Sequence, residues 1–231
     1  MSASGAFVIT AKDAKGRARA GILRTAHGEV ETPVFMPVAT QGSIKALSQE
    51  DLDALGVQAI LANSYHLYLR PGAGTVAAAG GLHSFMSYRG AILTDSGGFQ
   101  VLSLSSLREV KDEGVTFRSH LDGSEHTLTP ESVVALQAEL GSDIWTALDE
   151  PAEYPCTPER ARAALRRTQR WLEASEKTFK KLSAGRERPA LFFPILQGGL
   201  FPDLRREAAE HMAQIAHQGV SLGGFSVGEP K

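Results

Sequence analysis

Apolar and polar residues alternate along roughly the first 30 positions of the chain, around Gly16, Gly21 and Gly28. Segments such as FVITA and AGILRTAHGEVETP follow this alternation, which is typical of half-buried β-strands. The glycines supply the turns between them. The pattern therefore predicts short antiparallel strands that form a lid on the main domain.

A different rhythm follows, in which short apolar runs rich in β-branched residues are separated by helical segments. Strands that alternate with helices are typical of a parallel sheet with helical crossovers, so we predict an α/β fold. Six runs are expected to be strands: Val34–Ala39, Val57–Ala62, Ala91–Thr94, Asp143–Leu148, Leu191–Leu196 and Val220–Ser226.

The helices between these runs carry recognisable start signals. Ser48 can cap the helix in QEDLDALG, and Thr129-Pro130 gives an N-cap and a first-turn proline to ESVVALQAELG. Pro202 opens a helix over DLRREAAEHMAQIAHQG. The longest helix is expected from Pro158 to Leu182. Its apolar face contains Ala161, Leu165, Trp171 and Leu172.

A polar, glycine-containing stretch from Ser105 to Thr127 interrupts this rhythm. Its alternation and its Asp122-Gly123 pair predict a hairpin. No internal repeat and no low-complexity linker divides the chain, so we interpret residues 1–231 as a single domain.

Composition narrows the class of protein. The chain has 231 residues, of which 42% are hydrophobic and 22% charged, so it can bury an ordinary globular core. The N-terminus resembles no secretory signal, and no apolar run approaches the ~18 residues that a membrane span needs. We therefore expect a cytoplasmic protein with no membrane partner.

Charge and cysteine content add little. The formal net charge of −2 does not indicate a polyanion partner. The segment from Arg160 to Arg188 contains ten Lys or Arg against three Glu, which suits contact with phosphates or, as we favour, a solvated helix face. The lone Cys156 cannot form an internal disulfide or by itself a thiolate zinc site, so we interpret it as a small loop residue.

Chemistry in a β/α barrel lies where strands run into their following loops. The predicted strand exits place Asp95 after the third run, Asp149 after the fourth and Gln197 after the fifth. Carboxylates beside apolar strands are costly unless they are paired, hydrogen-bonded or functional. Either aspartate could instead cap the next helix. For Asp149 the two interpretations are balanced, whereas the Ser-Gly-Gly that follows Asp95 favours function.

These side chains form a set that suits a nucleobase edge. Ionised carboxylates accept hydrogen bonds, Gln offers a donor and an acceptor, and a backbone N–H donates. A guanine-like base presents N–H and amino donors beside a carbonyl acceptor, which Asp149, Gln197 and the Gly224 backbone could satisfy. Glycine lets the backbone approach a ligand closely, and Phe99 offers a flat stacking surface.

A TIM-barrel sugar-phosphate enzyme is an alternative, because Gly-Gly pairs at strand ends also bind phosphate. Two carboxylates would repel a phosphate unless a metal intervened. Four of the seven histidines, His66, His83, His120 and His126, show no helical metal pair such as HExxH. Each lone His is favoured as a surface or core residue, so no metal site is expected in this chain.

Six segments, in order along the chain, resemble the tRNA-guanine transglycosylase (queuine tRNA-ribosyltransferase) family of bacterial type. They are TPVFMPVATQGSIKALS, ILANSYHLYLRPG, the highly specific LTDSGGFQVLSL, LGSDIWTALDE, ILQGG and GGFSVGE. The resemblance extends from the N-terminal strands to Lys231. It implies an irregular TIM (β/α)8 barrel, incomplete with about six of eight strands, preceded by antiparallel strands.

The resemblance implies that guanine at the wobble position of tRNA is exchanged for a deazaguanine, in queuosine biosynthesis and without a nucleotide cofactor. Asp95 would be the catalytic general acid/base, Asp149 would bind the N–H edge of the base, and Gln197 and the Gly224 N–H its carbonyl. The implied partners are tRNA and the base, with a homodimer at full length. The pocket would also be lined by Ser96, Gly97, Gly98, Phe99, Gly223 and Phe225.

The resemblance also predicts what this sequence lacks. In the family the aspartate nucleophile lies on a later strand, and the ligands of one structural zinc, three Cys and one His, lie later still. The sequence stops at Lys231 with neither. We therefore predict a C-terminally truncated chain without the last strands and the zinc subdomain, which binds base weakly and does not turn over.

Three positions bear on the base. Pro151 stands where family members often carry Cys, and Phe225 where they often carry Leu. Val227 resembles the bacterial form, which favours the smaller 7-aminomethyl-7-deazaguanine (preQ1) over queuine. A non-catalytic accessory subunit of the same fold is a further alternative, but the presence of both Asp95 and Asp149 argues against it.

Overall fold

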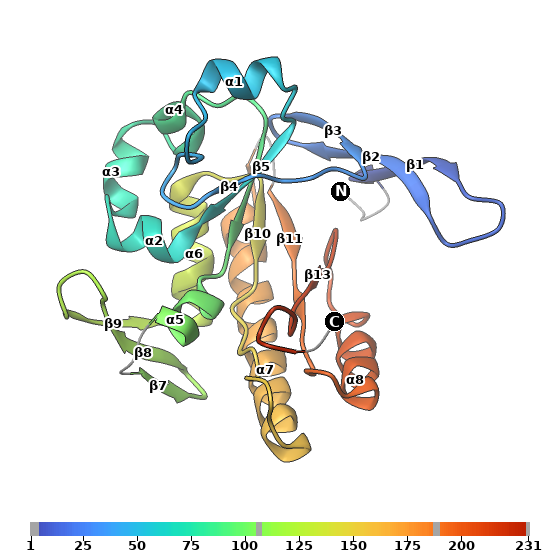
Figure 1. The fold of residues 1–231 in the computed structure, drawn as a ribbon. Helices are drawn as coiled ribbons and strands as arrows, with labels where there is room; N and C mark the ends of the chain where they lie inside the picture. Colours follow the sequence, from blue (N-terminus) through green and yellow to red (C-terminus); the bar gives the residue numbers. More distant parts are fainter. Residues whose placement is uncertain (1–4, 105–107, 187–189, 230–231) are drawn as a thin grey trace.

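A computed structural model of the chain describes residues 5–104, 108–186 and 190–229 (Figure 1). Five parallel strands form the central sheet in the order β11-β10-β6-β5-β4. The order follows the chain, as expected when each strand is joined to its neighbour by a helical crossover. The strands are β4 (Val38–Ala39), β5 (Ala59–Asn63), β6 (Ala91–Asp95), β10 (Ile144–Thr146) and β11 (Leu191–Phe193).

The run expected over 191–196 is two strands rather than one. β11 ends before Pro194, which has no N–H to donate to a ladder. β12 (Ile195–Leu196) then pairs in parallel with β13 (Ser221–Leu222), apart from the central sheet. Residues 223–225, expected within a strand, therefore lie beyond it. Within the described ranges the strands do not close into a barrel.

The N-terminal strands form an antiparallel sheet of β1 (Phe7–Lys12), β2 (Arg19–Thr25) and β3 (Gly28–Thr32), as predicted. Their ribbon extends away from the central sheet in Figure 1. Leu23 and Val30 pack against the residues that begin four central strands, Ala59, Ala91, Ile144 and Leu191. These strands therefore cover the amino-terminal end of the central sheet, opposite to the strand exits.

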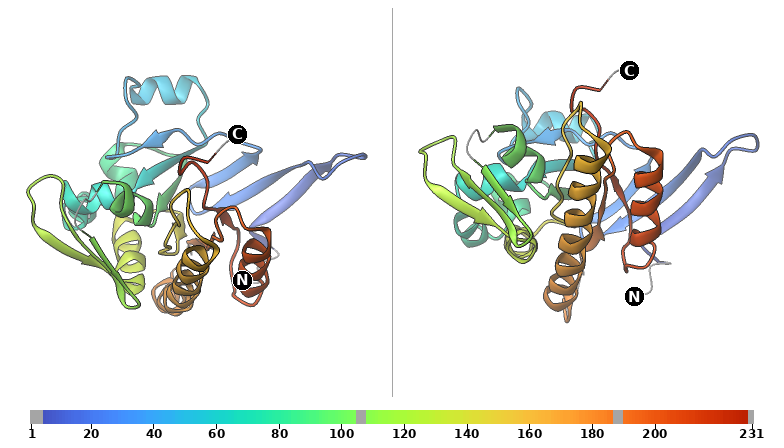
Figure 2. Two further views of the ribbon diagram at one scale, coloured as in Figure 1. Left: turned by 60° about the horizontal axis from the view of Figure 1, so that its bottom comes forward. Right: turned by 90° about the horizontal axis from the view of Figure 1, so that it is seen from below.

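The predicted helix starts are confirmed. Ser48 and Thr129 each form a capping box, at the starts of α1 and α6. The long helix α7 begins with Thr157 as N-cap, and it lies beside α8 (Figure 2). The helices are α1 (Gln49–Ala54), α2 (Ser64–Leu69), α3 (Ala73–Ala78), α4 (Leu82–Met86), α5 (Gly98–Leu104), α6 (Pro130–Leu140), α7 (Pro158–Ser183) and α8 (Pro202–Met212).

Helix α8 is shorter than the predicted 203–219. It ends at Met212 because the following residues return along β11. There Gln218 donates its backbone N–H to the Phe192 carbonyl, and its side-chain Oε1 accepts the Phe192 N–H at 2.8 Å. These bonds satisfy backbone groups at the edge of β11, which a continued helix would leave unpaired.

The two faces of the central sheet bury different residues. Ile60 and Ile92 pack with the core formed by helices α1 to α4 and α6. Leu61 and Leu93, one position further along each strand, pack with the N-terminal sheet. This alternation follows from the period of two in a strand. Asp95, two residues after Leu93, lies on the same face as Leu93.

The polar stretch after α5 forms three antiparallel strands rather than a single hairpin. They are β7 (Arg108–Lys111), β8 (Gly114–Arg118) and β9 (Glu125–Leu128), while residues 105–107 of the predicted stretch lie outside the described residues. Asp122-Gly123 lies in the loop between β8 and β9. The small sheet is anchored by Phe117, which packs with Tyr65, Leu148 and Trp171.

Candidate active site

The register of β5 and β6 places Asn63 directly beside Asp95 at the ends of the two strands. Asn63 Nδ2 donates to Asp95 Oδ2 at 2.5 Å, and the Ser64 backbone N–H donates to Oδ1 at 3.0 Å. Asn63 is fixed in this orientation because its own Oδ1 caps α2 by accepting the His66 N–H. The Asp95 carboxylate is therefore held by the strand and the helix that precede it.

Asp149 is buried after β10 and is held by two side chains. Ser96 Oγ donates to Oδ1 at 3.1 Å, and Gln197 Nε2 donates to Oδ2 at 2.6 Å. The next helix, α7, begins only at Pro158. The alternative that Asp149 caps that helix is therefore wrong.

Burial controls the protonation of both carboxyl groups. It raises the pKa of Asp95 to about 7, assisted by the negative charge of Asp149 and opposed by the Ser64 and Gly97 N–H groups. It raises the pKa of Asp149 to about 6, against the hydrogen bonds from Gln197 and Ser96. Near neutral pH this site can thus both hold and release a proton, which suits general acid/base chemistry.

The Gln197 side chain is buried and only partly satisfied. Its Nε2 binds Asp149, while its Oε1 has no hydrogen-bond partner among the described residues. A Cβ at Gly223 would lie 2.5 Å from Nε2, and one at Gly224 would lie 3.1 Å from Oε1. Both glycines therefore allow the chain to pass close to this amide, whose Oε1 is a buried acceptor without a partner in the described part of the chain.

The Ser-Gly-Gly turn after β6 packs against Asp149. A Cβ at Gly98 would meet the Asp149 backbone oxygen at 2.6 Å, so only glycine fits without a shift. Gly97 has φ +78°, and a Cβ there would lie 2.9 Å from Tyr65 Cβ. The structure therefore brings together the predicted residues Asp95, Ser96, Gly97, Gly98, Asp149, Gln197, Gly223 and Gly224.

The two predicted aromatic residues stand at the surface of the site. Phe99 in α5 is 43% exposed and Phe225 is 47% exposed. The Arg205 guanidinium lies 4.5 Å from the Phe225 ring centroid and donates to the Gly223 carbonyl at 3.0 Å. Arg205, on α8, thus holds the loop after β13, a role that nothing in its local sequence indicated.

Sequence reasoning assigned no role to Glu150, the acidic residue directly after Asp149. Glu150 is almost fully buried and forms ion pairs with Arg160, at 2.8 Å, and with Arg167. Both arginines lie in the basic segment interpreted as a solvated face. The Glu-Pro that follows Asp149 was visible in the sequence, but its partners on α7 depend on how that helix packs.

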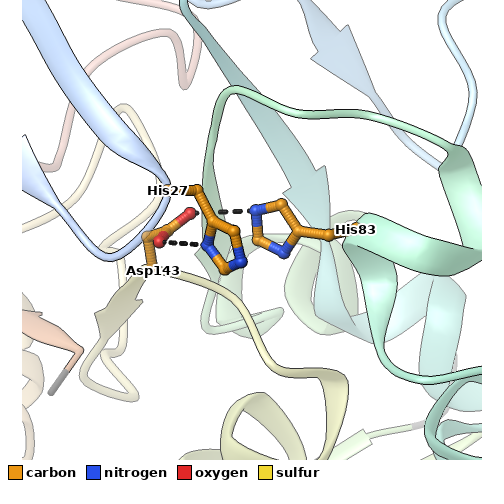
Figure 3. A group of neighbouring side chains, drawn as sticks. All are labelled: His27, His83 and Asp143. Carbon is orange, nitrogen blue, oxygen red and sulfur yellow. Dashed lines mark hydrogen bonds and ion pairs between the residues drawn. The ribbon is translucent and has the colours of Figure 1, made fainter. Parts of the chain in front are cut away.

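The histidines are paired rather than isolated. Tyr65 and His120 are hydrogen-bonded at 2.8 Å, and Tyr68 and His126 at 3.0 Å. At the other end of the central sheet, His27 and His83 both contact Asp143 (Figure 3). These partners are distant in sequence, so the local sequence pattern did not indicate them.

The fold and the site define an α/β protein with two carboxylates and a buried amide at the carboxyl ends of parallel strands. A family model described as "Queuine tRNA-ribosyltransferase" matches residues 13–231. The chain therefore belongs to the queuine tRNA-ribosyltransferase family. This confirms the resemblance inferred from the six segments.

Relatives that carry this family name are identical to the chain at about half of the aligned positions. Proteins named queuine tRNA-ribosyltransferase from Solibacter usitatus and Thermoanaerobacter sp. are 53% identical over 227 residues and 52% over 225, each covering 97% of this chain. One from Koribacter versatilis is 51% identical over 239 residues and covers all of it. The chain spans 60%, 59% and 62% of the lengths of these three relatives.

The zinc site implied by the resemblance does not fit the residues of this sequence. That site takes three Cys and one His, whereas the sequence has a single Cys. Cys156 lies in the loop before α7, as predicted, and burial raises the pKa of its thiol.

Among the described residues, no helix is long and apolar enough to cross a membrane.

Proposed function

We propose that this chain binds a guanine-type base and moves its ring proton as part of a tRNA-guanine transglycosylase, a pentosyltransferase of queuosine biosynthesis. The observation that carries the proposal is the hydrogen bond of 2.6 Å between Asp149 and the Gln197 amide, beside Asp95. Partners of this activity are tRNA and the base, guanine or preQ1.

The base is recognised through complementary donors and acceptors. Ionised Asp149 accepts from the ring N–H and the exocyclic amino group, which adenine does not present in this arrangement. The second N–H of Gln197 Nε2 and the backbone N–H of Gly224 donate to the carbonyl of the base. Phe99, partly exposed beside the turn after β6, supplies a ring for stacking.

Asp95 is the proton carrier in this proposal. When a nucleophile, in the family an aspartate on a later strand, forms a bond to the ribose carbon, the glycosidic bond of guanine breaks. The electrons of the broken bond stay on the ring nitrogen, which needs a proton to leave as neutral guanine. A carboxyl group with a pKa of about 7 can supply it and then remove the equivalent proton from the incoming base. Asn63 and Ser64 hold its oxygens in place for both steps.

The finer features of the fold belong to the same proposal. The parallel strands follow chain order, and apolar side chains are exposed on both outer strands, at Val38 of β4 and Leu222 of β13. We take the strands to be an arc of an irregular (β/α)8 barrel with its chemistry at the carboxyl ends. The homodimer and the preference for preQ1 over queuine also stay predictions.

Calorimetric titration with guanine tests the base site. The wild-type chain is expected to bind guanine at least about tenfold more tightly than adenine or a sugar phosphate. Asp149→Asn, which presents a donor to the donors of the base, is expected to lower guanine affinity at least about tenfold. Asp122→Asn, at an exposed loop position, is the matched control. Equal affinity for adenine, or tighter binding of a sugar phosphate, would overturn the proposal.

Incorporation of labelled guanine into tRNA tests the chemical step. The prediction that the 231-residue chain does not turn over is wrong if this chain incorporates the label. In that case Asp95→Asn is expected to abolish incorporation while guanine binding falls by less. Exchange that is insensitive to Asp95→Asn would show that Asp95 is not the proton carrier.

A further inference from the structure

His27, His83 and Asp143 converge at the amino-terminal end of the central sheet, away from the base site (Figure 3). His27 comes from the turn between β2 and β3, His83 from α4, and Asp143 directly precedes β10. His27 Nδ1 lies 2.7 Å from Asp143 Oδ1, and His83 Nε2 lies 3.1 Å from Oδ2. One nitrogen from each ring and one carboxylate oxygen lie within 4.8 Å of one another.

We propose that these three side chains bind a divalent transition-metal ion, with Zn²⁺ as the best candidate. Two imidazole nitrogens and one carboxylate oxygen are a donor set that Zn²⁺ takes in proteins, with bonds of about 2.0–2.2 Å. Two atoms at such distances from one tetrahedral ion lie about 3.4 Å apart. The observed spacings of 2.7 and 3.1 Å are shorter than this and involve the two different oxygens of Asp143, so the side chains must move apart to admit an ion.

The surroundings support a metal ligand at Asp143. Its side chain is fully buried, and its Oδ2 also accepts the Ile92 backbone N–H at 2.8 Å, the kind of outer contact that orients a ligating carboxylate. The side chains of His83 and His27 are 12% and 38% exposed. The His27 side is therefore open for an ion to enter and for water to serve as a fourth ligand.

The two imidazole rings are stacked against each other. Their centroids lie 3.4 Å apart and their planes differ by 19°. Imidazole binds metals through a ring nitrogen. The competing interpretation is a clasp in which both rings donate N–H to Asp143, and His83 Nε2 also approaches the Gly90 carbonyl at 3.2 Å.

A bound ion would join three segments that are far apart in sequence. His27 and Asp143 are 116 residues apart, and His83 and Asp143 are 60 apart. The ion would fasten the β2–β3 turn to the sheet that this turn covers. Binding is therefore expected to raise the thermal midpoint of the chain, because an ion held only by the folded state stabilises that state.

Metal titration of the chelator-treated 231-residue chain tests this proposal. Equilibrium dialysis with Zn²⁺ at about pH 7.5, where most imidazoles are neutral, is expected to give about one ion per chain. Co²⁺ should produce visible absorption bands that Zn²⁺ abolishes. His27→Gln and His83→Gln should each weaken Zn²⁺ binding at least about tenfold and remove the Zn²⁺-dependent rise of the thermal midpoint.

His217→Gln is the control, since His217 lies outside the cluster and contacts the Ile215 carbonyl. It is expected to bind Zn²⁺ as the wild type does. His27 is partly exposed, so His27→Gln is the variant expected to keep its fold, which circular dichroism verifies. No Zn²⁺ uptake by the wild type, or equal uptake by a folded His27→Gln chain, would overturn the proposal and leave the hydrogen-bonded clasp.

Discussion

The Gln197 side chain donates a hydrogen bond of 2.6 Å to Asp149, and this bond links the end of β12 to the end of β10. Those two strands belong to different sheets. The bond therefore connects two sheets, which separate where Pro194 interrupts the run of strand residues between β11 and β12. The buried Gln197 Oε1, which has no partner among the residues that the structure describes, and Asp149 with its raised pKa both lie at this connection.

Asp149→Asn is expected to stabilise the chain above about pH 6. The variant keeps both hydrogen bonds, since Asn can accept from Gln197 and donate to the Ser96 hydroxyl. The pKa of Asp149 is about 6 in the folded chain against an ordinary 3.8, so the folded state binds the proton more tightly. Wild-type stability should therefore fall as pH rises from about 4 to about 6.

Above about pH 6, the free energy of unfolding of Asp149→Asn should exceed that of the wild type by about 2–3 kcal/mol. This difference should vanish near pH 4. Urea denaturation at several pH values measures it. Asp122→Asn should instead be less stable than the wild type at about pH 4 to 8, because contacts with Ser124 stabilise the ionised carboxylate and lower the pKa of Asp122 to about 2. A constant difference from pH 4 to pH 8 would contradict the burial argument for Asp149.

Gly98→Ala should disturb the site, whereas Gly74→Ala should not. The new methyl at position 98 would meet the Asp149 backbone oxygen at 2.6 Å, while at position 74 its nearest neighbour is Glu139 Oε1 at 3.8 Å. We expect Gly98→Ala to lower the free energy of unfolding by about 1–3 kcal/mol. We also expect it to weaken guanine binding, because Asp149 would have to shift. Gly74→Ala, inside α3, should gain about 0.5–1 kcal/mol. Thermal denaturation compares them, and equal effects would be inconsistent with the close contact.

Arg167→Met should lower stability by about 2–4 kcal/mol, because it leaves Glu150 buried with one of its two arginine partners. Arg24→Met, which breaks the exposed pair with Glu29, should change stability by less than about 1 kcal/mol. Urea denaturation of both variants measures the contrast. The Arg167 argument fails if both variants lose the same amount.

Asn63→Ser should raise the pKa of Asp95. A serine keeps a hydroxyl that can cap α2 but loses the amide that donates to Asp95 Oδ2. A carboxylate with fewer donors ionises less readily, so its pKa moves further above its value of about 7. Carbon-13 NMR of the Asp95 carboxyl carbon during a pH titration follows this change. An unchanged or lower pKa would show that Asn63 does not position the carboxylate.

Much of the secondary structure was determined by short-range pattern. Ser48 and Thr129 cap their helices because a side-chain oxygen satisfies a backbone N–H three residues later, an interaction complete within one turn. Each apolar run contains a parallel strand, as predicted, although the run over 191–196 is divided into two, and Asp149 follows its strand while Asp95 is the last residue of β6. Alternation of apolar residues also identified the N-terminal sheet.

Only the tertiary structure decided how distant residues meet. Asn63 is 32 residues from Asp95, and their contact depends on the register of β5 against β6. The division at Pro194 and the shortened α8 follow from backbone groups that find partners on other segments. His27, His83 and Asp143 converge only when the β2–β3 turn packs against the sheet, because local sequence carries no record of which distant side chain completes a hydrogen bond or a ligand set.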